Sequence, residues 1–176
     1  MGTHLQLIKK LQPLLSVDIV DLGMSAAERG DLETATYICD YLATRKRQKN
    51  LNSLTRIMKK IGYEPIPFLS DARRITETFQ KTTKGTNNLY IILLNDEKEG
   101  FGLYVGQTSK AIKDRFAQHL TGNRKENYAA RCHKQMLMLL PSLFSHLNPL
   151  STIEAKAIEK SLIELFKSHG IRTKGA

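Results

Sequence analysis

Cysteines are scarce in this sequence, and long apolar runs are absent. Only 2 cysteines occur among 176 residues, Cys39 and Cys132, and they lie far apart with no partner at metal-ligand spacing. We therefore expect neither a disulfide framework nor a zinc finger. We expect a reducing, cytoplasmic setting. The longest apolar runs, such as residues 89–94, are too short to cross a bilayer. The first residues lack the order of a secretory signal, so no membrane association is expected.

Acidic residues are in the minority. The chain has 27 Lys and Arg against 17 Asp and Glu, a net charge of +10 at pH 7. The densest basic run is residues 44–63, which contain no acid; its basic residues are Arg45, Lys46, Arg47, Lys49, Arg56, Lys59 and Lys60. Such a run suits phosphate contacts with release of counterions, although a solvated helix face or a linker has the same composition. We expect nucleic-acid contacts from its first four basic residues, Arg45, Lys46, Arg47 and Lys49.

The first part of the chain has the apolar spacing of helices. Stripes at helical spacing occur near residues 5–15, 34–42 and 54–61, and Gly62 follows the last stripe as a left-handed cap. Two prolines then interrupt the chain, and Ser70 is a candidate cap for a further helix through Phe79. The sequence therefore predicts an all-helical, basic region over residues 1–80.

The periodicity changes after a polar segment, residues 81–87, which we interpret as a linker. Residues 89–94 and 101–105 are apolar runs separated by a polar loop, which predicts an antiparallel hairpin buried on both faces. Residues 110–120 predict a helix with Ile112, Phe116 and Leu120 on its buried stripe and Arg115 and His119 at the edge of that stripe. A further helix is predicted over residues 129–140, ending at Pro141.

These elements define an α+β fold class. We expect a small antiparallel β-sheet flanked by helices over residues 88–176, preceded by the all-helical region and the linker. A monomer or a transient dimer is expected.

The last long helix, predicted over residues 152–169, contains two candidate glutamates. Ser151 and Glu154 have the spacing of a capping box, which gives Glu154 a structural role. Glu159 projects into the apolar arc between Ile163 and Phe166, opposite a charged face. A carboxylate in that position needs a cationic partner, either an internal Arg or Lys or a metal ion.

The residues between 88 and 120 have a recognisable order. Tyr90 and Tyr104 lie on the two predicted strands, Gly106 ends the second strand, and Arg115 and His119 are four residues apart on one helix face. Over roughly residues 87–170 the chain resembles the GIY-YIG nuclease family. Asn88-Leu89-Tyr90 stands at the first signature tripeptide, with its tyrosine matching, and Tyr104-Val105-Gly106 matches the second. Glu159-Lys-Ser-Leu162-Ile163 is similar to the pattern around that family's metal-binding glutamate.

The resemblance implies a metal-dependent endonuclease that hydrolyses phosphodiester bonds of nucleic acid, most simply double-stranded DNA. Glu159 would bind Mg²⁺ or Mn²⁺, and Arg115 would neutralise charge developing on the phosphate. The resemblance further implies that Tyr90 takes a proton from the attacking water, with Tyr104 or His119 relaying or orienting it. Lys110 and Lys113, beside Arg115, are expected to bind the phosphate backbone without taking part in the chemistry.

Two alternatives remain open. The first is a nucleic-acid-binding protein with this fold that has lost catalysis, which the altered first tripeptide favours and the retained Tyr, Arg, His and Glu residues disfavour. The second is a basic helical adaptor whose hairpin is only core. The cheapest experiment that discriminates the nuclease from these alternatives is a plasmid-nicking assay with Mg²⁺ and with EDTA.

Overall fold

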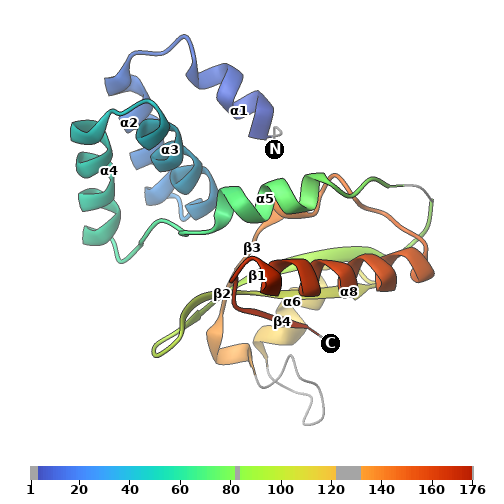
Figure 1. Cartoon of the computed structure of the whole chain (residues 1–176). Coiled ribbons are helices and arrows are strands. Elements are labelled where there is room, and N and C mark those ends of the chain that lie inside the picture. Colours follow the sequence, from blue (N-terminus) through green and yellow to red (C-terminus); the bar gives the residue numbers. More distant parts are fainter. Residues whose placement is uncertain (1–3, 82–83, 122–131, 176) are drawn as a thin grey trace. The chain divides into compact units, whose positions relative to one another are not determined.

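The computed structural model describes residues 4–81, 84–121 and 132–175 (Figure 1). The chain divides into two compact units, Met1–Ser70 and Asp71–Ala176. The division falls within α5 (Leu69–Glu77), earlier in the chain than residues 81–87, which the sequence suggested as a linker. Within the described ranges, no helix is long and apolar enough to span a membrane.

The first unit is helical. It contains α1 (His4–Leu11), α2 (Ser16–Glu28), α3 (Leu32–Thr44) and α4 (Gln48–Lys60). Helices α2, α3 and α4 pack on one another around Ile38 and Leu54. Gly23 allows the closest approach of α2 to α4, because a Cβ built there would lie 2.6 Å from Leu54 Cδ2.

Local signals explain where these helices begin and end. Asp31 caps α3 by accepting a hydrogen bond from the Thr34 backbone N–H at 3.1 Å. Gly62 follows α4 with a φ of 84°, which confirms the predicted left-handed cap. The prediction that Ser70 caps the next helix is wrong, because α5 already begins at Leu69 and the Ser70 hydroxyl donates to the Asp40 carboxylate.

The second unit is built on a sheet of four strands. They are β1 (Asn88–Asp96), β2 (Gly100–Thr108), β3 (Met136–Leu139) and β4 (Thr173–Gly175), in the order β3-β1-β2-β4. Strands β1 and β2 form the predicted antiparallel hairpin, and the central residues of both are buried. The α+β class is confirmed. The sheet is mixed, since β4 adds to β2 in parallel.

Strand β3 replaces the end of the helix predicted over residues 129–140. Residues 133–135 form a 3-10 helix, η1 (His133–Gln135), and the apolar residues that follow pair with β1, with Leu139 opposite Ile92. A short apolar run has no periodicity that separates a buried strand from a helix, so only the partner strand decides. The beginning of that prediction lies outside the described residues.

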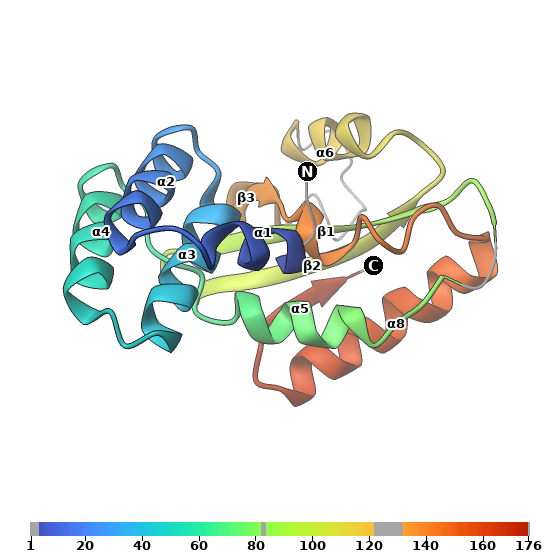
Figure 2. The same cartoon turned by 90° about the horizontal axis from the view of Figure 1, so that it is seen from above.

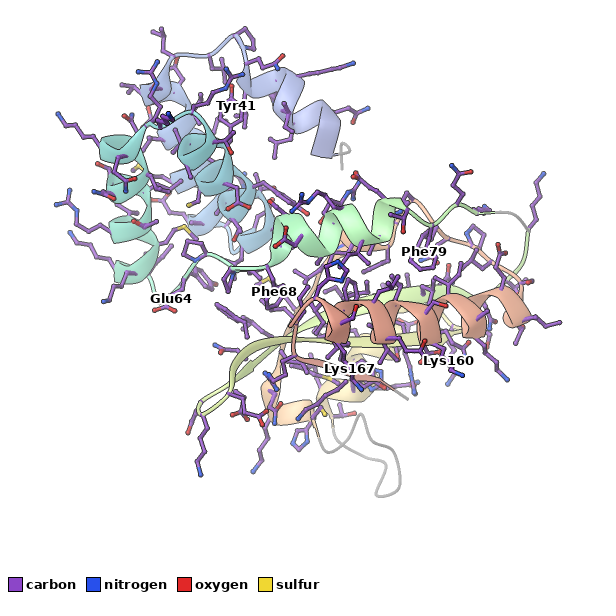
Figure 3. All side chains as sticks on the ribbon, viewed as in Figure 1. Tyr41, Glu64, Phe68, Phe79, Lys160 and Lys167 are labelled. Carbon is purple, nitrogen blue, oxygen red and sulfur yellow. The ribbon has the colours of Figure 1, made fainter. Side chains whose placement is uncertain are left out.

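The helices of the second unit cover the hairpin. In Figure 2, α6 (Ile112–Leu120) and α8 (Thr152–Ser168) lie on opposite sides of β1 and β2. A second 3-10 helix, η2 (Pro141–Leu143), follows β3. The predicted faces of α8 are confirmed: Ile158, Leu162 and Phe166 are buried, and Lys160 and Lys167, labelled in Figure 3, are exposed.

Candidate active site

Two tyrosines meet on one face of the hairpin. Tyr90 pairs with Gly106 and Ile92 pairs with Tyr104, and because side chains alternate along a strand, both tyrosine rings project from the same face. The rings stack with their centroids 6.2 Å apart and an angle of 22° between their planes. Each side chain is only 1% exposed, so the two rings form the floor of a buried cluster.

Gly106 makes room for the Tyr90 ring. A Cβ built on Gly106 would lie 2.5 Å from the Tyr90 hydroxyl oxygen and 2.6 Å from its Cζ. No side chain fits there without moving the ring. The glycine of the second tripeptide therefore positions the tyrosine of the first, and β2 continues past it to Thr108 rather than ending there as predicted.

His119 completes the cluster from α6. Its Nε2 lies 2.7 Å from the Tyr90 hydroxyl oxygen, a hydrogen-bond distance, and its ring centroid lies 5.5 Å from that of Tyr90 and 5.4 Å from that of Tyr104. The predicted orientation of α6 is wrong: His119 is the buried residue at 3% exposure, and Leu120 is 45% exposed. Contacts with both tyrosine rings and the hydrogen bond offset the cost of burying the imidazole.

Burial controls the ionisation of both tyrosines. It raises the pKa of Tyr90 above its ordinary value of 10.0, while Arg115 acts in the opposite direction through a side-chain hydrogen bond and its charge. The pKa of Tyr104 is also raised, mainly by burial and secondarily by Tyr90, and Arg115 lowers it. Both phenols are therefore neutral at pH 7, and Arg115 is the cation that favours their ionised forms.

Arg115 lies four residues before His119 on α6. Its Nη1 donates to Gln118 Oε1 at 3.4 Å. Its charge lowers the pKa of both tyrosines, and for Tyr90 a side-chain hydrogen bond adds to the effect. An arginine in this position can meet a phosphate with a planar, two-pronged donor.

Glu159 adds a carboxylate from α8. It is 7% exposed, and its charge raises the pKa of both Tyr90 and Tyr104. Glu154, the other candidate, lies in the first turn of α8, where its backbone N–H donates to the Ser151 hydroxyl at 3.2 Å. The N-terminal cap predicted for Ser151 is confirmed.

The donor set fits a magnesium ion only in part. Among the residues that the structure describes, no three His, Cys, Asp or Glu residues gather as a complete metal cage. Magnesium does not need one, because it is commonly held by one or two carboxylates, with water and substrate phosphates supplying the other ligands. A buried carboxylate such as Glu159 fits that mode of binding.

The residues expected to bind nucleic acid are exposed in their own units. Lys110 precedes α6 and Lys113 lies in its first turn, and both are exposed. Arg45, Lys46, Arg47 and Lys49 are exposed in the helical unit. Within the second unit, Tyr90, Tyr104 and His119 are in contact, and Arg115 and Glu159 act electrostatically on both tyrosines.

The sequence did not reveal the residue that fixes the start of β1. Asn148 clamps Leu89, the residue before Tyr90: its Oδ1 accepts from the Leu89 N–H at 2.8 Å, and its Nδ2 donates to the Leu89 carbonyl at 2.7 Å. The amide replaces a neighbouring strand at this edge. No motif signals such a contact across 59 positions of sequence.

Comparison with known families agrees with this geometry. Residues 86–172 match the model of the GIY-YIG catalytic domain. The chain therefore belongs, through this domain, to the GIY-YIG nuclease family. The comparisons with curated proteins and with solved structures found no match.

Proposed function

We propose that this chain is a divalent-metal-dependent endonuclease that hydrolyses phosphodiester bonds in double-stranded DNA. The observation that carries the proposal is the 2.7 Å contact between the Tyr90 hydroxyl and His119 Nε2, inside a cluster that also contains Tyr104, Arg115 and Glu159. These residue types can supply the proton acceptor, the phosphate-neutralising cation and the metal ligand that phosphodiester hydrolysis uses.

Hydrolysis needs an acceptor for the proton of the attacking water. With Nε2 of His119 unprotonated, the Tyr90 O–H donates to it. As the water oxygen attacks phosphorus, the water proton moves to the Tyr90 oxygen and the phenol proton moves to His119 Nε2. The tyrosine ends the step neutral, and the imidazole carries the positive charge.

This proton relay explains how a tyrosine that is neutral at pH 7 can act as a base. An ordinary phenol with a pKa near 10 is about 0.1% ionised at pH 7, and burial raises the pKa of Tyr90 further. Because His119 Nε2 lies within hydrogen-bond distance of the Tyr90 hydroxyl, it can accept the phenol proton as the water proton arrives, and no standing population of tyrosinate is needed. Tyr104 packs against both rings and holds them in register.

Charge on the phosphate has to be neutralised as the water attacks. Arg115 is suited to this, because its guanidinium is always protonated and can contact two phosphate oxygens at once. Glu159 would hold Mg²⁺ or Mn²⁺, which when bound supplies a Lewis acid for the phosphate and the leaving oxygen. Lys110 and Lys113 would bind the adjoining backbone phosphates.

The test is a nicking assay on supercoiled plasmid, run with Mg²⁺, with Mn²⁺ and with EDTA. Cleavage that EDTA abolishes and that a Tyr90→Phe preparation lacks supports the proposal, and that variant also controls for contaminating nucleases. A folded wild-type protein that binds plasmid without cutting it under any of these conditions would instead favour a binding protein that has lost catalysis. Single-stranded DNA and RNA of the same sequence, assayed in parallel, test the choice of substrate.

A further inference from the structure

The helical unit presents α4 through a very short turn. Helix α3 ends at Thr44 and α4 begins at Gln48, so only residues 45–47 join them. Lys46 has a φ of 55°, in the left-handed region, and its N–H and that of Arg47 donate to the carbonyls of Ala43 and Leu42, both at 2.9 Å. Helices joined this closely form a unit that many DNA-binding proteins use to present their second helix.

The two sides of α4 differ sharply. Leu54 and Met58 are fully buried and hold the helix in the unit, where it packs against α2 and α3. At 100° per residue the side opposite Met58 is polar, with the half-buried Ile57 at one edge of it. Its exposed members are Lys49, Asn52, Arg56, Lys59 and Lys60. Figure 3 shows nitrogen-tipped side chains extending from this helix, between the levels of Tyr41 and Glu64.

The charge of this surface indicates which kind of macromolecule it can bind. No acid occurs between Asp40 and Glu64, so the turn and the whole of α4 are cationic. A membrane is a poor match, because the apolar side of α4 is already buried and its exposed side has no apolar anchor. A single strand is also a poor match, since the exposed side of α4 has no aromatic ring on which bases could stack.

The beginning of α4 carries hydrogen-bonding groups of the kind that read base edges. The exposed Gln48 and Asn52 side chains are one turn apart, and Gln48 Nε2 donates to Asn52 Oδ1 at 2.6 Å. This contact orients both amides on the surface. Arg56, one turn further, lies on the same side. Asn and Gln make paired hydrogen bonds with adenine, and Arg makes them with guanine, in the major groove.

We propose that α4 is a base-reading helix that lies in the major groove of double-stranded DNA. Gln48, Asn52 and Arg56 contact base edges, while Arg45, Lys46, Arg47 and Lys49 contact phosphates. The inference rests on the proposed function in one respect, since the duplex that α4 reads is the duplex that the nuclease domain cuts. The proposal goes beyond charge attraction, because it requires that the protein prefer one DNA base sequence over another.

The experiment is selection of binding sites from a pool of randomised duplexes with the full-length wild-type protein in EDTA. Wild type is expected to enrich a short consensus. Affinity for that consensus and for a scrambled duplex is then measured for Asn52→Ala and Arg56→Ala. Loss of one paired base contact should reduce the ratio of the two affinities by about 5- to 150-fold.

Matched control variants distinguish base recognition from non-specific charge attraction and from a loss of protein stability. Gln12→Ala removes an exposed amide and Arg29→Ala removes an exposed cation elsewhere in the same unit, and both should keep the wild-type ratio. The quadruple variant at Arg45, Lys46, Arg47 and Lys49 should weaken binding to both duplexes equally. It should also flatten the dependence of log K on log salt by about 0.9 per lost contact. Thermal unfolding confirms that each variant is folded.

Two results would overturn the inference: wild type binds the pool but enriches no consensus, or the consensus preference survives both Asn52→Ala and Arg56→Ala. Neither result bears on cleavage, which the plasmid assay in Mg²⁺ reads separately. Conversely, if the wild-type protein selects a consensus but does not nick plasmid, this inference is supported and the proposed nuclease activity is contradicted.

Discussion

Gly106 and Tyr90 face each other across the β1–β2 hairpin, and the missing side chain of the glycine leaves the space that the tyrosine ring occupies. A Cβ on residue 106 would lie 2.5 Å from the Tyr90 hydroxyl oxygen. The second signature tripeptide thus supplies the space that the tyrosine of the first tripeptide fills. Any substitution of Gly106 is therefore expected to move Tyr90 in the candidate active site as well as to alter strand β2.

Gly106→Ala should displace Tyr90 from His119. We expect a loss of about 1–3 kcal/mol in the free energy of unfolding, because the buried ring has little room to move, together with a large loss of nicking. Gly100→Ala is the matched control: Gly100 has a φ of 69° and open space around it, so it should cost stability through the backbone alone and keep activity per folded molecule. Full activity of folded Gly106→Ala would contradict the assigned role of Tyr90.

Tyr90→Phe and His119→Ala should each reduce the nicking rate by about 10²- to 10⁴-fold, since each removes one member of the proton relay. The double variant should be no worse than the poorer single variant, because the two groups act as a unit. His169→Ala, which changes an exposed histidine, is the control. Additive losses in the double variant would argue for separate roles.

Glu159→Gln should abolish metal-dependent cleavage and leave DNA binding in EDTA largely intact, because it removes the carboxylate that would hold the metal and keeps its size. Isothermal titration with Mn²⁺ provides a readout other than activity, and the variant should lose the heat of binding. Glu154→Ala should cost about 1 kcal/mol of stability or less and retain cleavage. The assignment would be reversed if Glu154→Ala were inactive and Glu159→Gln active.

Arg115→Lys should lower the nicking rate by orders of magnitude while non-specific DNA binding hardly changes, because lysine keeps the charge but loses the planar, two-pronged donor. Arg74→Lys makes the same exchange at an exposed position on α5 and should be neutral. Near-normal turnover by Arg115→Lys would mean that the residue only attracts the substrate.

Tyr104 should make the protein sensitive to alkali. Burial raises the pKa of Tyr104 in the folded state, so the folded protein keeps a proton that the unfolded chain releases at its ordinary value of about 10. This contribution to stability is complete below about pH 10 and is lost as the pH rises toward the folded-state pKa. Tyr104→Phe should therefore lose less stability than wild type between about pH 9 and 11, measured by urea unfolding. Equal losses would show that Tyr104 ionises with little penalty.

The sequence determined the elements whose patterns are local. The β1–β2 hairpin follows from two apolar runs around a polar loop, the cap at Ser151 follows from spacing, and Glu159 was distinguished from Glu154 because one lies in the apolar arc of α8. These features depend on residues a few positions apart, and helix and strand periods are fixed by backbone geometry. The prediction that Tyr90, Tyr104, Arg115 and His119 are site residues rests in the same way on a short motif.

Tertiary structure decided the rest. Strand β3 was expected to be helical, because nothing local in Met136–Leu139 shows that β1 offers an unpaired edge. Helix α6 turns His119 inward and leaves Leu120 exposed, since the stacked rings of Tyr90 and Tyr104 provide a polar partner that the apolar stripe of the helix could not reveal. The parallel addition of β4 and the Asn148 clamp on Leu89 join residues far apart in sequence. Such contacts form only when the folded chain brings distant segments together, so a local sequence pattern cannot predict them.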